Sequence, residues 1–172
     1  VKSLPDGFES EAPSWLASWS DVLALADSFC QRIKEDLVQE EAKNRGFEFA
    51  LMLDTQGFVA ECGTEAVFIV KDDCLLTPVP GTILRSITRK SILELARTTD
   101  IKIHEARLHP DLLFDADEIF LSSTPFKFIP VGKIEDHILG ETPGHITKKL
   151  SSLMTDITIG RDERFSNWLF HV

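Results

Sequence analysis

The hydrophobic pattern of the chain changes its period near Gly46. Before this glycine, apolar residues recur three or four positions apart, the spacing of one face of a helix; they are Val22, Leu25, Phe29, Ile33 and Leu37. Ser20 can cap such a helix at its start, and Gly46 can end it. We therefore expect a helix over 20–44, preceded by an irregular lead-in over 1–19.

After Gly46, short apolar runs alternate with turn signals, which is typical of strands. The first hairpin is expected from Phe47–Leu53 and the run 58–61, around the turn Asp54-Thr-Gln-Gly57. A second is expected from Val67–Val70 and Leu75–Thr77, around Lys71-Asp-Asp73. Further strands are expected at Ile101–Glu105, Glu118–Ser122, Phe128–Val131 and Ile134–Leu139.

Three more helical stretches lie between or after these strands. One is expected to start at Thr88, with Ile92, Leu95 and Ala96 on its inner face, a short one spans His109–Ala116, and the last follows Thr142-Pro-Gly144 and ends near Asp156. Short strands with helices between them predict an α+β fold around a mixed or barrel-like sheet. With its leading helix, this domain would occupy residues 20–172.

Composition narrows the classes of function. The 172 residues are 43% hydrophobic and carry a net charge of −10, which argues against a nucleic-acid backbone as the main ligand. No apolar run is long enough for a membrane span. Three cysteines without metal-like spacing and five scattered histidines indicate a reduced, cytoplasmic protein without a metal site. A local anion site built from backbone N–H groups remains compatible with the acidic chain.

Four sequence segments, taken in their order along the chain, are more specific evidence than the hydrophobic pattern. They are ALMLDTQGFVAECGTEAVFIV from Ala50, TPVPGTILRSITRKSILELA from Thr77, DADEIFLSSTPFKFIPV from Asp115 and GETPGHITKKL from Gly140. With the closing GRDERFSNWLFHV, they resemble the second, C-terminal domain of the class IV (fold-type IV) pyridoxal-phosphate-dependent aminotransferases, in particular the branched-chain amino acid aminotransferases. The resemblance begins near residue 37.

The resemblance implies a bound pyridoxal 5'-phosphate and roles for particular residues. Glu61 would lie beside the ring nitrogen and favour its protonated form, and Leu84 would pack under the pyridine ring. The backbone N–H groups of Ile87 and Thr88 would hold the phosphate at a helix N-terminus, where unpaired donors and the helix dipole favour an anion. The Thr88 hydroxyl would add a hydrogen bond.

A second set of phosphate contacts is implied at two turns. The turn at Ser123 and Thr124 would supply another hydroxyl, and the backbone near Thr64 and Glu65 would approach the phosphate as well. Each residue also has an ordinary structural interpretation, because a glutamate in a hairpin is commonly solvated and a threonine is a good helix cap. The joint pattern supports the site, and no single residue does so alone.

The catalytic lysine of the family is not identified in this chain. Its position falls on Asp27 or Ser28, and Lys2, in the segment VKSL, would require a long insertion to take its place. Lys34 lies on the polar side of the leading helix. The family tyrosine that bonds the ring oxygen falls near Arg32, and the chain contains no tyrosine.

The function implied is amino-group transfer between an amino acid and 2-oxoglutarate, or another 2-oxo acid, by a cytoplasmic homodimer. Because the lysine is not found, two forms stay open: a part of an enzyme that needs further residues, or a relative that kept the fold and lost the reaction. Relatives of aminodeoxychorismate lyase or D-amino-acid transaminase share the same site and are an alternative. A non-catalytic module that binds proteins through the old dimer surface is another.

Overall fold

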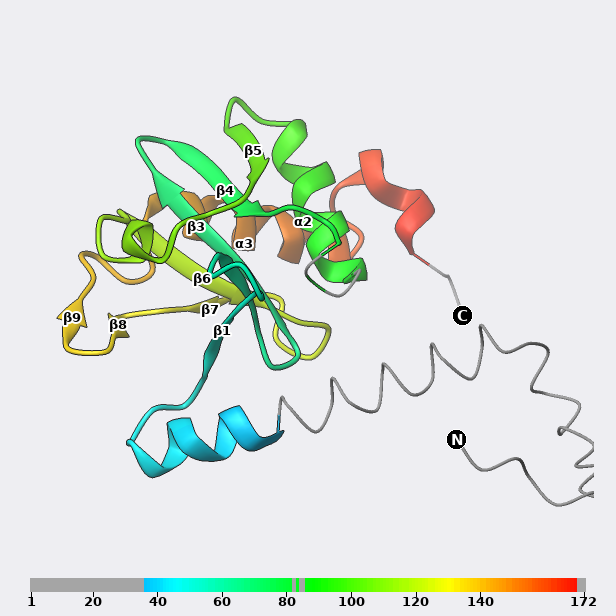
Figure 1. Cartoon of the computed structure of the whole chain (residues 1–172). Helices are drawn as coiled ribbons and strands as arrows, with labels where there is room; N and C mark the ends of the chain where they lie inside the picture. The colour runs from blue at the N-terminus through cyan, green and yellow to red at the C-terminus, as the bar shows by residue number, and fades with distance from the viewer. Residues whose placement is uncertain (1–35, 82, 84–85, 170–172) are drawn as a thin grey trace, which may run out of the picture.

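The computed structural model describes residues 36–81, 83 and 86–169. In this part, one sheet contains β1 Leu51–Leu53, β2 Val59–Cys62, β3 Glu65–Lys71, β4 Cys74–Pro78, β5 Lys102–Ala106, β6 Glu118–Ser122 and β7 Ile129–Pro130. The strands β8 Lys133–Ile134 and β9 His137–Ile138 form a separate hairpin. The helices are α2 Ile87–Arg97 and α3 His145–Thr158, the 3₁₀ helices are η1 Pro110–Leu113 and η2 Glu163–Trp168, and residues 36–44 are also helical (Figure 1).

Strand β3 lies at the centre of the sheet. Its residues Ala66–Val70 pair with β6 along one edge, while its other edge is shared between β2 at one end and β4 at the other. Strands β4 and β5 are parallel, and the remaining pairs are antiparallel. The N–H of Val59 donates to the carbonyl of Leu108 at 2.9 Å, which ties β2 to the chain just after β5. The sheet therefore curls toward a barrel, as the sequence predicts for this α+β fold.

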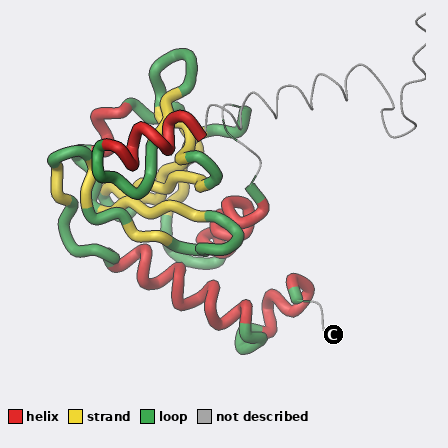
Figure 2. Tube along the Cα trace, turned by 90° about the horizontal axis from the view of Figure 1, so that it is seen from below, coloured by secondary structure: helices red, strands yellow, loops and turns green. Residues whose placement is uncertain are grey.

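The alternation of side chains along β3 divides the apolar residues into two cores. Ala66, Phe68 and Val70 face the helices α2 and α3, where Phe68 stacks on Phe120 of β6 with ring centroids 4.8 Å apart. The intervening residues, Val67 and Ile69, face the other core with Leu108, Leu113 and Leu139. Figure 2 shows α3 running along one side of the strands and leading into η2 near the C-terminal end. We call the side of the sheet that α2 and α3 cover the helix face.

The buried carboxylate of Glu118 fixes the start of α3. It lies on the helix face of β6 and accepts hydrogen bonds from the N–H groups of Ile146 and Thr147, each at 2.9 Å. Gly144 comes directly before α3, and a Cβ atom there would overlap the Glu118 carboxyl group. A negative charge at a helix N-terminus satisfies donors that the helix itself leaves unpaired. The protein thus closes the N-terminus of α3 with its own side chain.

Several boundaries differ from those expected from the sequence. Of the run Phe47–Leu53, only β1 is a strand, and β6 has the predicted bounds. The helix expected to start at Thr88 begins at Ile87 and is capped by Ser86, whose hydroxyl accepts from the N–H of Arg89.

Two further segments are also shorter or differently folded. The stretch His109–Ala116 contains only the 3₁₀ helix η1, which His109 caps. The stretch Ile134–Leu139 is not one strand but part of the β8–β9 hairpin, because Glu135 adopts a positive φ of 48° and reverses the chain. The lead-in and the start of the leading helix lie outside the described residues.

Candidate functional site

The N-terminus of α2 presents two backbone donors. Within the first turn, the N–H of Arg89 is taken by the Ser86 hydroxyl and that of Lys90 by the Ser86 carbonyl. The N–H groups of Ile87 and Thr88 precede the first intrahelical bond and have no hydrogen-bond partner among the described residues. They are therefore available to an acceptor, and the partial positive charge of the helix end makes an anion the preferred one.

A buried arginine holds this helix end against the sheet. The guanidinium of Arg89 donates to the Thr77 hydroxyl at 3.3 Å, to the Pro78 carbonyl at 2.7 Å and to the carboxylate of Glu105 at 2.8 Å. Thr77 in turn donates to the Val67 carbonyl at 2.9 Å, in the gap between β2 and β4. These contacts fix the direction of the first turn of α2 relative to β3.

The turn that follows β6 comes to the same helix end. The hydroxyl oxygens of Thr88 and Thr124 are 3.5 Å apart. Ser123 is buried, and the Ser122 and Ser123 hydroxyls have no hydrogen-bond partner in the described part of the chain. The backbone N–H groups of Ile87 and Thr88 thus lie close to two hydroxyl groups, those of Thr88 and Thr124.

Glu61 lies on the same face of the sheet. It pairs with Ala66 across one edge of β3, and Ser122 pairs with Ala66 across the other. Directly paired residues of neighbouring strands point to the same side, and Ala66 belongs to the core under α2 and α3. The row Glu61–Ala66–Ser122 therefore puts a buried carboxylate, a small residue and a buried hydroxyl on the helix face. We call this row, with Ile87, Thr88 and Thr124, the cup.

Glu65 does not join the cup through its side chain. It pairs with Cys62, and Cys62 packs in the core on the opposite face of the sheet. Its carboxylate accepts from the Thr64 hydroxyl at 2.9 Å. Burial, followed by the charges of Glu65 and Glu61, raises the pKa of the Cys62 thiol far above its usual range, so this thiol stays protonated.

Leu84 lies outside the described residues, as do the three positions considered for the lysine, Lys2, Asp27 and Ser28. Their place relative to the cup therefore stays a prediction. Ser122 was not among the candidates from the sequence, because a serine at the end of a strand carries no pattern of its own. Only the missing hydrogen-bond partner distinguishes it.

The N-termini of α2 and α3 differ in the side chains that lie next to them. At α3 the carboxylate of Glu118 accepts from the first N–H groups. At α2 the nearby side chains of Thr88 and Thr124 are hydroxyls, which can donate as well as accept. Among the described residues, no cluster of three His, Cys, Asp or Glu side chains is placed to hold a metal. An arrangement rich in donors at one end and carrying a carboxylate at the other suits a ligand with a phosphate and a basic group.

The described residues form an α+β domain whose helix face carries the cup. A sequence model described as amino-transferase class IV matches residues 22–134. The chain belongs to the class IV aminotransferase family.

One sequence relative and two solved structures show what the chain is similar to within this family. The chain is 37% identical over 170 residues to a probable branched-chain-amino-acid aminotransferase of Synechocystis, covering 97% of this chain and 55% of that one. A solved structure of the branched-chain amino acid aminotransferase from Thermobaculum terrenum in its PLP-form superposes with a TM-score of 0.79 at 34% identity, over 81% of this chain and 46% of that chain. The enzyme from Thermoproteus uzoniensis with norvaline gives 0.77 at 31% identity, over 81% and 46%. The chain spans about half the length of the relatives it matches.

Proposed function

We propose that this chain is the cofactor-binding domain of a branched-chain-type aminotransferase and that the cup binds pyridoxal 5'-phosphate. The observation that carries the proposal is the convergence of donors at the N-terminus of α2, where the Thr88 and Thr124 hydroxyls lie 3.5 Å apart. The family match and the PLP-form of the Thermobaculum relative support it. The domain boundaries proposed are 20–172, with a lead-in over 1–19.

Each residue of the cup has a task that its own chemistry supports. The N–H groups of Ile87 and Thr88, with the hydroxyls of Thr88 and Thr124, would bind the phosphate, and the hydroxyl of Ser123, which precedes Thr124 in the same turn, would be a further donor. The carboxylate of Glu61 would hold a proton on the pyridine nitrogen, because an opposite charge favours the protonated form. The cofactor, when bound, supplies an electron sink for chemistry at the amino acid's α-carbon. Leu84 would pack against the ring and Glu65 would contribute through its backbone, while the lysine position at Asp27 or Ser28 offers no amine.

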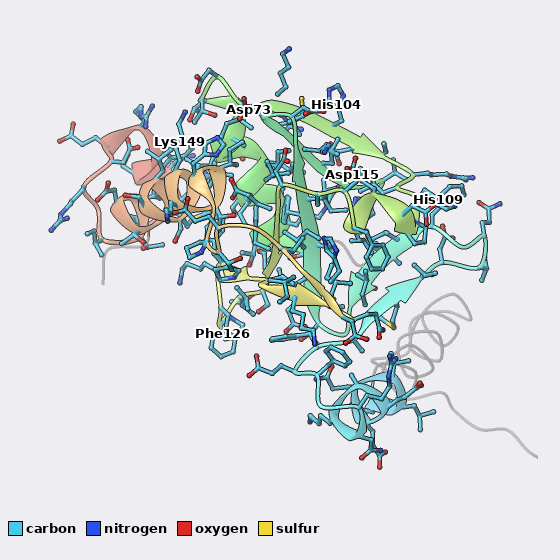
Figure 3. The ribbon with its side chains drawn as sticks, turned by 90° about the vertical axis from the view of Figure 1, so that its left-hand side faces the viewer. Asp73, His104, His109, Asp115, Phe126 and Lys149 are labelled. Atoms are coloured by element: carbon cyan, nitrogen blue, oxygen red, sulfur yellow. The ribbon has the colours of Figure 1, made fainter. Side chains whose placement is uncertain are left out.

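The substrates proposed are an apolar amino acid and a 2-oxo acid such as 2-oxoglutarate. The Thermoproteus relative is solved with norvaline, an apolar amino acid, which supports this class. A cytoplasmic homodimer is part of the proposal. The side chain of Ile87 is 82% exposed and that of Phe126, which projects from the turn after β6 (Figure 3), is 61% exposed. Exposed apolar residues beside a site support a surface that another chain covers. No helix among the described residues has the length and apolarity to cross a bilayer.

The test uses pyridoxamine 5'-phosphate, which has no aldehyde and therefore forms no covalent bond with surface lysines. Isothermal titration of the full chain should show one saturable site. The double variant Thr88→Ala, Thr124→Ala removes two hydroxyl donors, each worth about 1 kcal/mol, so its affinity should fall by at least about tenfold. Thr155→Ala, which removes an exposed hydroxyl of α3, is the matched control. Equal affinity of wild type and double variant would show that the ligand binds elsewhere.

A further inference from the structure

The hydroxyl of Ser122 is an unexplained feature of the helix face. The side chain has a relative exposure of 0%, and its Oγ atom has no hydrogen-bond partner in the part of the chain that the structure describes. Buried polar atoms are nearly always paired, since an unpaired one keeps the whole cost of its desolvation. A hydroxyl in this state indicates that its partner is not a residue of the described fold.

Its position indicates where that partner lies. Along the helix face, β6 presents Glu118, Phe120 and Ser122 in alternation. Glu118 meets the N-terminus of α3 and is fully used there, and Phe120 is core. Ser122 lies at the other end of the same strand, two residues before Thr124, whose hydroxyl reaches the N-terminus of α2.

The pairing of residues across the sheet also locates the Ser122 hydroxyl. Ser122 and Glu61 flank Ala66 on the same face, on neighbouring strands to either side of β3. Two strand spacings separate them, about 10 Å, and the residue between them, Ala66, has a small, buried side chain. A ligand that reaches from Glu61 to the N-terminus of α2 would therefore pass the Ser122 hydroxyl.

We propose that Ser122 is a further ligand-binding residue of the cup, whose hydroxyl donates a hydrogen bond to the phosphorylated pyridine ligand held between Glu61 and α2. This inference rests on the proposed function and adds to it a donor inside the sheet, distinct from the turn at Thr124. It also predicts the direction of the stability change in a variant that lacks the hydroxyl. In the ligand-free protein no hydrogen bond offsets the desolvation of the Ser122 hydroxyl, so its removal should not destabilise the fold.

The experiment compares wild type with Ser122→Ala and, as a matched control, with Ser152→Ala, which removes an exposed hydroxyl of α3. Each full-length chain is titrated with pyridoxamine 5'-phosphate and melted with and without it. For Ser122→Ala we expect a ligand-free melting temperature equal to or above that of wild type, together with about fivefold weaker binding, the worth of one hydrogen bond. Ser152→Ala should match wild type in affinity.

The other outcomes decide against the proposal, and they separate it from the proposed function. Wild-type affinity in Ser122→Ala, with loss in the Thr88→Ala, Thr124→Ala variant, would remove Ser122 from the cup and leave the cup in place. A ligand-free melting temperature several degrees below wild type would show a structural role for the hydroxyl and overturn the inference. If wild type itself does not bind pyridoxamine 5'-phosphate, the proposed function fails, and this inference fails with it.

Discussion

The hydroxyl oxygens of Thr88 and Thr124 lie 3.5 Å apart, although 36 residues separate them in the sequence. Thr88 is in the first turn of α2, and Thr124 is in the turn after β6, so the fold must bring a helix end and a strand end together to create the contact. Two neutral hydroxyls at this distance stabilise each other little. Their proximity is more useful to a third group that accepts from both.

A double-mutant cycle tests whether the two threonines serve one ligand. Thr88→Ala and Thr124→Ala should each weaken the binding of inorganic phosphate by about 1 kcal/mol, about fivefold. Because both hydroxyls would contact the same anion, the double variant should deviate from additivity by at least about 0.5 kcal/mol. Titration calorimetry at fixed ionic strength measures all four proteins. Strict additivity would place the two hydroxyls at separate sites.

Glu61 should discriminate between phosphate alone and a ligand that carries a pyridine ring. Glu61→Gln keeps the shape of the side chain but removes the charge that favours a protonated ring nitrogen. The affinity for pyridoxamine 5'-phosphate should fall about tenfold, the usual difference between a charge-assisted and a neutral hydrogen bond. The affinity for inorganic phosphate should not change, since phosphate has no ring. An equal loss for both probes would mean that Glu61 only supports the fold.

The stability of the domain should depend strongly on Glu118. Its carboxylate accepts from the N–H groups of Ile146 and Thr147, and it is buried, so Glu118→Ala leaves two helix donors without a partner. Hydrogen bonds to charged groups contribute about 1.5–3 kcal/mol each, and the free energy of unfolding should fall by about 3 kcal/mol or more. Urea denaturation followed by circular dichroism measures this loss. Glu141→Ala removes an exposed partner of Lys148 and should change little.

The sequence predicts those parts of the fold that local chemistry decides. The hairpin at Asp72 and Asp73 is predicted correctly because Asp tolerates the positive φ values, 50° and 59°, that the turn adopts. Strand β6 contains the apolar run 119–121 and has its predicted bounds. Glu135 also adopts a positive φ, but glutamate is not a residue type that indicates a turn. The prediction of one strand in place of the β8–β9 hairpin is therefore wrong.

The cup depends on contacts that a single sequence does not contain. Glu61 and Thr124 are placed in one site by resemblance to the family, and no periodicity relates them. The pattern favours Thr88 as the start of α2, although Ser86 caps it, because both are good caps and lie two residues apart. Ser122 escapes prediction for another reason, since an unpaired hydroxyl becomes visible only when every neighbour is in place.

The Cys62 thiol should make the domain less stable in alkali. Burial, and then Glu65 and Glu61, raise the pKa of this thiol in the folded chain, whereas the unfolded thiol titrates near its ordinary pKa of about 8.5. The folded state therefore holds a proton that the unfolded state loses, and stability is complete below about pH 8.5 and falls as the pH rises above it. The loss attributable to Cys62 should approach about 1.4 kcal/mol per pH unit.

Cys62→Ala isolates this contribution from other groups that titrate in alkali. The variant will be less stable near pH 7 because it leaves a cavity, but its disadvantage should shrink between pH 9 and pH 10.5, a range chosen to lie about 0.5 to 2 units above the unfolded thiol pKa. Cys74→Ala, at a partly exposed position, serves as the comparison. A constant difference between wild type and Cys62→Ala over that range would contradict the raised pKa.

The chain by itself should not carry out transamination. The family resemblance places the lysine position on Asp27 or Ser28, and neither side chain can form a Schiff base with an aldehyde or provide an amine as the base at the α-carbon. The chain also has no tyrosine to bond the ring oxygen. Purified protein supplied with pyridoxal 5'-phosphate, leucine and 2-oxoglutarate should therefore form no glutamate above the rate without protein. Borohydride reduction followed by peptide mass spectrometry should find no single lysine that is labelled preferentially. Binding of pyridoxamine 5'-phosphate, measured in parallel, separates an inactive cup from an absent one. If a reduced adduct mapped to Lys2 or Lys34, and replacing that lysine by alanine abolished glutamate formation, the placement of the leading helix against the family would be wrong and the chain would be an enzyme in its own right.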